Sequence, residues 1–158
     1  MEDFSQIIKI LKDHGIDFVL IGGLAAVVYG SSQVTQDIDI CIEFTPDNLK
    51  KLRKCFRGYN PVHRMTTKHL SFLEFPEDVT TLKNVYLETD LGVIDILSHV
   101  TAVGTYQDLL KSAEEIDLFG YTCHVISIQD LIKSKKEMAR FKDKIVAQEL
   151  LLILKEKK

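Results

Sequence analysis

Two aspartates, Asp37 and Asp39, stand two residues apart in an isoleucine-rich run that is typical of a β-strand. Side chains alternate between the two faces of a strand, so both carboxylates would point to the same side. A third acid, Asp95, lies in another apolar run that predicts a second strand, and Gly22 and Gly23 precede the first pair. Carboxylates bind divalent metal ions, and glycines let backbone amides approach phosphate groups. We therefore expect a site for the metal and the phosphates of a nucleoside triphosphate.

The three carboxylates suit the transfer of a nucleotide, because that reaction depends on positioning and charge neutralisation. Two Mg²⁺ ions about 3.5–4 Å apart, or Mn²⁺ in their place, could activate the incoming oxygen and stabilise the departing pyrophosphate. On this hypothesis, Asp37 and Asp39 share both ions. Asp95 binds the catalytic metal and accepts the proton of the attacking hydroxyl. Ser31 or Ser32 could add a hydroxyl contact to the phosphates.

The Asp-x-Asp pair also occurs in two other classes of protein, glycosyltransferases and phosphatases of the haloacid dehalogenase type. Such a phosphatase needs an apolar strand that leads into the first aspartate, whereas residues 31–36 are polar. A glycosyltransferase would explain neither the upstream glycines nor Asp95. The glycine pair together with the three acids therefore favours nucleotidyl transfer.

The pattern Gly-Gly … Asp-Ile-Asp … Ile-Asp-Ile resembles the polymerase-β-like nucleotidyltransferase superfamily. Residues 22–39 resemble a bacterial subgroup that includes AbiE-type abortive-infection toxins and small antibiotic-modifying nucleotidyltransferases. A C-terminal run, Leu-Ile-x-x-Lys-(x4)-Arg-x-Lys-Asp, matches the spacing found in that subgroup. The resemblance implies that Gly22 and Gly23 contact the nucleotide and that Lys135 and Arg140 contact its phosphates, with Lys142 after them.

One residue departs from the subgroup, which commonly has arginine where this chain has Gln33. If that arginine helps to bind the triphosphate, nucleotide affinity or activity is reduced here. Three hypotheses follow: a Mg-dependent enzyme that moves a nucleoside monophosphate to an acceptor hydroxyl, a catalytically degenerate nucleotide-binding module, and one half of a toxin–antitoxin pair. The acceptor stays open among a small molecule, a tRNA end and a protein side chain.

The elements around these residues predict an α/β (α+β) nucleotidyltransferase fold, a mixed β-sheet flanked by helices. We expect one domain over residues 1–158, with a sheet core at about 16–128 and C-terminal helices at about 129–156 that break near Phe141. Residues 57–83 have no clear pattern, and Arg64 within them is expected on the plain surface, with a substrate role as the second alternative. The expected helices are 4–14, 24–29, 46–56 and 106–113, and the expected strands are 17–21, 37–44, 84–88, 93–98 and 121–126.

The composition is that of an ordinary globular protein, with 46% hydrophobic and 27% charged residues. A net charge of −3 gives no general attraction to nucleic acid or to an anionic membrane. The three cysteines form no Cys-x-x-Cys pair and show no ligand spacing with histidine, which argues against zinc. The acidic start lacks the basic region of a signal peptide, and no apolar run approaches the ~18–20 residues of a membrane span. We expect a cytoplasmic protein with no membrane partner and with an antitoxin or homo-oligomer partner open.

Overall fold

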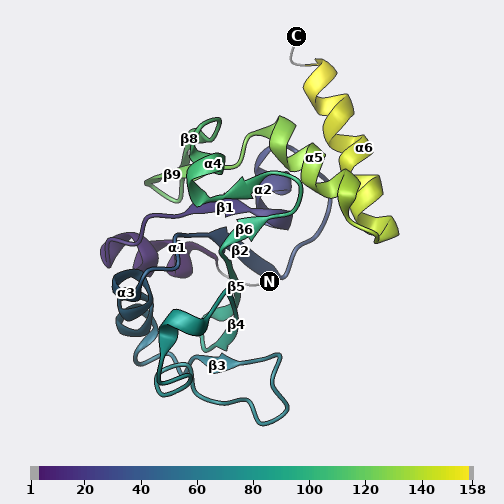
Figure 1. Cartoon of the computed structure of the whole chain (residues 1–158). Helices are drawn as coiled ribbons and strands as arrows, with labels where there is room; N and C mark the ends of the chain where they lie inside the picture. Colours follow the sequence, from purple (N-terminus) through teal and green to yellow (C-terminus); the bar gives the residue numbers. More distant parts are fainter. Residues whose placement is uncertain (1–3, 157–158) are drawn as a thin grey trace.

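The computed structural model describes residues 4–156, which fold around a mixed sheet of seven strands (Figure 1). The strand order is β3-β4-β5-β2-β1-β9-β8, and β6 pairs with β7 in a separate small sheet. The strands are β1 (Val19–Ile21), β2 (Asp37–Cys41), β3 (Val62–His63), β4 (Asn84–Thr89), β5 (Gly92–Leu97), β6 (His99–Val100), β7 (Gly104–Thr105), β8 (Glu114–Leu118) and β9 (Tyr121–Val125).

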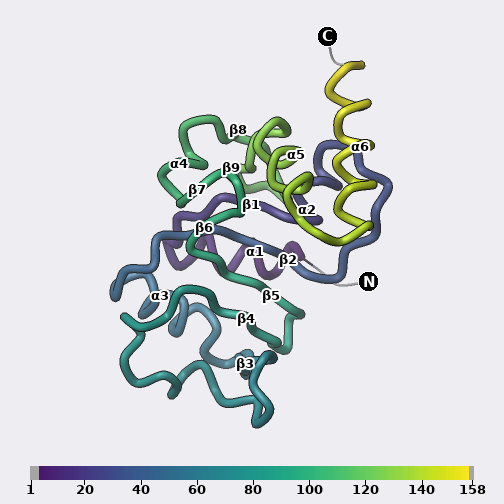
Figure 2. Tube along the Cα trace, turned by 45° about the vertical axis from the view of Figure 1, so that its right-hand side comes forward, coloured from purple at the N-terminus to yellow at the C-terminus, as the bar shows by residue number. Residues whose placement is uncertain are grey.

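Helices lie on both sides of this sheet, so the predicted fold class is confirmed. The helices are α1 (Phe4–Asp13), α2 (Gly22–Val28), α3 (Pro46–Phe56), α4 (Tyr106–Leu110), α5 (Ile128–Glu137), α6 (Phe141–Glu156) and the short 3₁₀ helix η1 (Val79–Thr81). Figures 1 and 2 show α1 beside α3 at one side of the molecule and the α5–α6 pair at another. Within residues 4–156, no helix is both long and apolar enough to cross a membrane.

The central strands set the relative positions of the predicted site residues. Strand β2 runs parallel to β5 and antiparallel to β1. In this register Asp39 is paired with Asp95 on one side and with Ile21 on the other. On the opposite face of β2, Ile38 and Ile40 are fully buried in the core. The apolar alternation therefore fixes the carboxylates on the other face of the strand, because a one-residue slip would turn them into the apolar core.

Several expected element boundaries are wrong. Strands β1 (Val19–Ile21) and β2 (Asp37–Cys41) are shorter than the expected 17–21 and 37–44. Helix α2 begins at Gly22 rather than Leu24, so the two glycines form its first turn. Helix α4 ends at Leu110, and the sequence did not predict strand β8 that follows. Strand β8 lies at the edge of the sheet with side chains that are exposed or half-buried, so its apolar pattern is weak. The expected break near Phe141 is confirmed, because α6 begins there.

Candidate active site

Asp39 lies at the centre of the candidate site, between β1 and β5. Its Oδ1 atom is buried and accepts no hydrogen bond from residues 4–156. A Cβ atom added to Gly22 would lie 2.1 Å from Asp39 Oδ2, and Gly22 has a φ of +71°. Only glycine combines that backbone conformation with so close an approach. Gly22 therefore allows the carboxylate to lie against the start of α2.

The surroundings of Asp39 favour its protonated form when no cation is bound. The pKa of Asp39 is raised to about 7, first by burial and then by the negative charges of Asp95 and Asp37, while the charge of Lys135 lowers it. A buried carboxylate with like charges beside it is costly unless a cation neutralises it. The unpartnered Oδ1 and the raised pKa both identify a position where a cation would stabilise the folded protein.

A pocket of about 390 Å³ opens beside Asp37 and Asp39. It brings together residues that are far apart in the sequence, from the start of α2, the loop before β2, and the α5–α6 junction. Most of the lining is polar, as phosphate groups require. The lining residues are Gly23, Gln33, Val34, Thr35, Gln36, Asp37, Asp39, Lys135, Arg140, Lys142 and Asp143.

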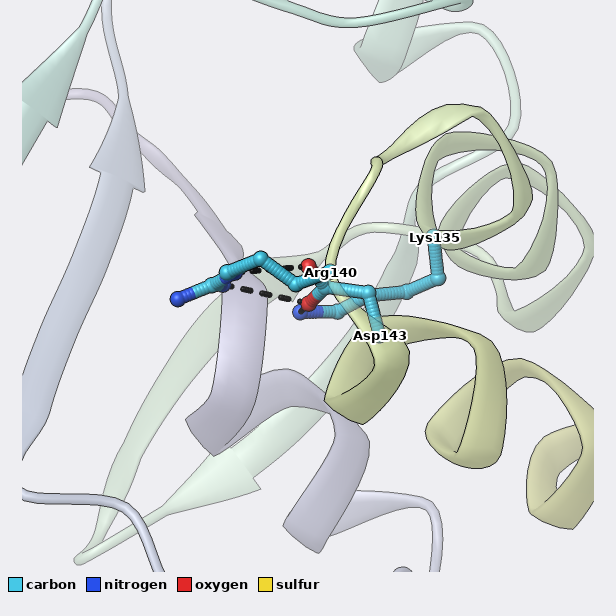
Figure 3. Close-up of polar contacts among 3 residues, drawn as sticks. All are labelled: Lys135, Arg140 and Asp143. Atoms are coloured by element: carbon cyan, nitrogen blue, oxygen red, sulfur yellow. Dashed lines mark hydrogen bonds and ion pairs between the residues drawn. The ribbon is translucent and has the colours of Figure 1, made fainter.

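Two cations of this pocket are held by one buried carboxylate, that of Asp143 (Figure 3). Lys135 Nζ donates to Asp143 Oδ1 at 3.1 Å, and Arg140 donates through Nε to Oδ2 at 2.8 Å and through Nη2 to Oδ1 at 3.1 Å. The Asp143 side chain is 1% exposed, whereas that of Arg140 is 69% exposed. Although burial alone would raise it, the hydrogen bonds from Arg140 and Lys135 lower the pKa of Asp143. Asp143 is therefore a positioning residue, a role that its motif spacing did not suggest.

The third acid, Asp95, is also bound by an arginine. Arg64 donates through Nη1 to Asp95 Oδ1 and through Nη2 to Asp95 Oδ2, the latter at 3.0 Å. The expectation that Arg64 lies on the plain surface is wrong. The pair is separated by 31 residues and comes from the segment without a clear pattern, so no sequence spacing could have indicated it.

The predicted metal ligands are neighbours, but they do not converge on one point. Among residues 4–156, no three side chains of His, Cys, Asp or Glu are placed to hold a metal ion together. Asp37 and Asp39 line the pocket, whereas both oxygens of Asp95 accept hydrogen bonds from Arg64. Oxygen ligands with one buried, unpartnered atom fit a hard divalent cation at Asp37 and Asp39.

The two serines and Gly22 lie elsewhere than expected. The Ser31 hydroxyl donates to Glu149 Oε1 at 2.6 Å, and the Ser32 hydroxyl donates to Glu149 Oε2 at 2.7 Å. Neither serine lines the polar pocket, so in this structure they anchor the loop before β2 to α6. Gly22 lines a smaller, more apolar pocket of about 120 Å³ that shares Asp39 with the first.

Comparison with known proteins agrees with this geometry. Residues 1–57 match the family described as "Nucleotidyl transferase of unknown function (DUF2204)". The chain is also similar to the lincosamide antibiotic adenylyltransferase LnuA, solved with lincomycin bound, with a TM-score of 0.60 and 16% identity over 93% of each chain. The chain has a nucleotidyltransferase fold.

A second structure supports the same conclusion about the nucleotidyltransferase fold. An antigenic nucleotidyltransferase-like protein from Paracoccidioides brasiliensis aligns with a TM-score of 0.56 and 16% identity, over 94% of this chain and 72% of that one. No curated protein matches the sequence. The resemblance to polymerase-β-like nucleotidyltransferases, predicted from the glycine pair and the aspartates, is thus confirmed for the fold.

Proposed function

We propose that the protein transfers a nucleoside monophosphate from a nucleoside triphosphate to an acceptor hydroxyl, with the help of divalent metal ions. The observation that carries this proposal is the composition of one pocket. Asp37 and Asp39 lie there with Lys135 and Arg140, in a volume of about 390 Å³. That volume lies in the range of small-molecule sites, about 300–1,000 Å³. Carboxylates for a metal and cations for phosphates therefore meet in a space that a nucleotide can occupy.

Each residue has a separate task in this proposal. Asp37 and Asp39 would hold Mg²⁺ or Mn²⁺, which would polarise the phosphates and lower the pKa of the acceptor hydroxyl. Lys135 and Arg140 neutralise the triphosphate, and Asp143 holds both cations at the pocket wall. Gly23 lets the start of α2 pack closely against Thr35 in the pocket wall, because a Cβ there would lie 2.9 Å from Thr35 Oγ1.

The reaction is a displacement at the α-phosphorus. The acceptor oxygen forms a bond to that phosphorus, the bond to the bridging oxygen of the β-phosphate breaks, and pyrophosphate leaves with the bonding electron pair. Asp95, next to Asp39 in the sheet register, accepts the proton of the acceptor hydroxyl once its carboxylate is free of Arg64. Asp37 and Asp39 keep the phosphates in line with the incoming oxygen.

The test of this function is a thermal-shift panel of the four ribonucleoside triphosphates with and without Mg²⁺. The variants are Asp39→Asn and, as a matched control, Asp47→Asn, whose side chain is 78% exposed on α3. A ligand at 100 times its dissociation constant adds about 2.7 kcal/mol, which for a domain of this size raises Tm by several degrees. We expect a Mg²⁺-dependent rise in the wild type and in Asp47→Asn, and none in Asp39→Asn. No rise with any triphosphate in the wild type would overturn the proposal.

Turnover is then measured as pyrophosphate release in the presence of candidate acceptors. Lincomycin, which is bound in the LnuA structure, is a reasonable first acceptor. Release that requires both the acceptor and Mg²⁺ would support transfer.

A second candidate function, nucleotide binding without transfer, is favoured by Gln33. This residue lines the pocket at the position where the subgroup commonly has arginine. Triphosphate binding without pyrophosphate release would favour this function over catalysis. A Gln33→Arg variant should then bind triphosphate more tightly than the wild type, because it adds a cation to the same wall.

A further inference from the structure

Arg64 is held over the acid cluster by three contacts. Its guanidinium bonds to both oxygens of Asp95, and its Cζ lies 5.4 Å from the centroid of the Tyr86 ring. Its backbone amide donates to the Tyr86 carbonyl at 3.1 Å. Tyr86 is also the cross-strand partner of Asp95, so both groups that hold Arg64 are adjacent on β4 and β5.

The charge of this guanidinium acts on all three aspartates. Burial alone would lower the pKa of Arg64, but the hydrogen bond and charge of Asp95, with smaller contributions from Asp37 and Asp39, raise it. Arg64 therefore already neutralises Asp95, a carboxylate that a metal ion would otherwise neutralise. The guanidinium thus occupies a cation position beside Asp37, Asp39 and Asp95.

A divalent cation at Asp95 and this guanidinium would compete with each other. Both need the lone pairs of the same carboxylate, and their positive charges repel. The arginine directly follows β3, a strand of only two residues that lies at the edge of the sheet beside β4 and is also bridged to Ser71. The Arg64 side chain is 24% exposed and that of Asp95 is 16% exposed, so the guanidinium can reach solvent when it leaves.

We propose that Arg64 is a displaceable counter-cation that occupies Asp95 in the metal-free protein and must leave before a divalent metal ion binds there. The inference rests on the proposed function and adds that Arg64 regulates when a metal ion can bind at Asp95. Asp95 is thereby kept from binding metal or accepting a proton until the metal–triphosphate complex arrives. Asp37 and Asp39, which Arg64 does not hydrogen-bond, remain available for the first contact with that complex.

The test is a Mn²⁺ titration followed by electron paramagnetic resonance, without nucleotide, at fixed pH and ionic strength. In Arg64→Ala we expect Mn²⁺ to bind about tenfold more tightly than in the wild type, as it would if Asp95 were free of Arg64 in only about a tenth of the wild-type molecules. Arg57→Ala is the matched control, because it removes the same formal charge from an exposed position. It should change affinity by less than about twofold, since exposed charges are screened by salt.

Two further variants test whether the effect passes through Asp95. In an Asp95→Asn background, the additional Arg64→Ala change should no longer tighten Mn²⁺ binding. Arg64→Lys keeps the charge but loses the two-point contact, so its affinity should lie between those of the wild type and Arg64→Ala. Arg64→Lys also provides the readout if Arg64→Ala does not fold, as judged by circular dichroism.

The outcomes separate this inference from the proposed function. If Mn²⁺ and Mn²⁺–triphosphate bind the wild type and Arg64→Ala equally well, the function stands and the counter-cation role is wrong. Weaker binding by Arg64→Ala would also overturn it, because Arg64 would then support the metal site. If no variant binds Mn²⁺ with or without triphosphate, both proposals are wrong.

Discussion

Two arginine–carboxylate clusters flank Asp39, and they differ in the task of the carboxylate. In the first cluster, Asp143 accepts three hydrogen bonds from Lys135 and Arg140 and is 1% exposed. In the second, Asp95 accepts two hydrogen bonds from Arg64 and is 16% exposed. The first carboxylate belongs to the scaffold and keeps its cations at the pocket, whereas the second is a candidate for the chemistry itself. The same pairing thus gives a fixed cation platform on one side and a removable cation on the other.

Removing Asp143 is expected to have the largest effect on stability. Asp143→Ala leaves the Lys135 ammonium, whose side chain is 8% exposed, without its partner. Breaking a buried pair in this way costs about 3–5 kcal/mol. Arg64→Ala, in the more exposed cluster, should cost about 1 kcal/mol or less.

Urea denaturation of both variants measures this difference. A second change, Lys135→Met, should restore part of the stability of Asp143→Ala, because it removes the unpaired buried charge. Equal losses of unfolding free energy in Asp143→Ala and Arg64→Ala would contradict this distinction between a structural and a removable ion pair.

The two clusters also show what the sequence could and could not predict. The register of Asp37, Asp39 and Asp95 follows from apolar alternation on neighbouring strands, so their proximity was predictable. Lys135 on α5 and Arg140 in the α5–α6 junction were expected from a motif spacing, and both line the pocket. Arg64 could not be found, because its partner is 31 residues away and its segment has no periodic pattern. Contacts fixed by regular elements could thus be predicted from the sequence, whereas a contact fixed by an irregular loop could not.

Gly22 fixes Asp39 between the two clusters, and a methyl group there should displace it. Gly22→Ala would place Cβ 2.1 Å from Asp39 Oδ2 and would also occupy a φ of +71°. We expect a loss of about 3 kcal/mol from the left-handed backbone and the clash together. Gly15→Ala is the matched control, because Gly15 has a φ of +68° and no atom of the described part of the chain lies within 4 Å of the added Cβ.

The control should lose only about 1–2 kcal/mol, the backbone share of the effect. Urea denaturation gives both values, and the Mn²⁺ titration should show weakened binding in Gly22→Ala alone. Equal stability of the two variants would mean that Asp39 can move away from Gly22 without cost.

The unpaired charge of Asp39 should make the stability of the metal-free protein depend on pH. The pKa of Asp39 is raised from 3.8 to about 7 in the folded state, so this group favours folding below about pH 4 and loses that contribution as pH rises through 7. At pH 8, Asp39→Asn should be more stable than the wild type by roughly 2 kcal/mol, because the substitution removes a buried charge. The difference should shrink as the pH falls from 8 to 5.

Urea midpoints at pH 8, 6.5 and 5, with chelator present, measure this dependence. The exposed control Asp47→Asn should show no comparable trend. A variant that is less stable than the wild type at pH 8 would mean that a cation already neutralises Asp39. In that case Arg64 would serve all three aspartates and not Asp95 alone.

The smallest expected effect concerns the loop that closes the pocket on the side of the Asp143 cluster. Ser31 and Ser32 were expected to contact phosphates, but both hydroxyls donate to Glu149 on α6, the helix that also carries Asp143. Ser31→Ala should therefore cost about 1 kcal/mol of stability. Ser32→Ala, which loses a more exposed hydrogen bond, should cost less stability.

Triphosphate affinity should change by less than about twofold in either variant, which fluorescence-detected nucleotide binding can measure. A tenfold loss of affinity without loss of stability would instead mean that the serines leave Glu149 for the phosphates, and that the wall beside Asp143 is as adaptable as the Arg64 side.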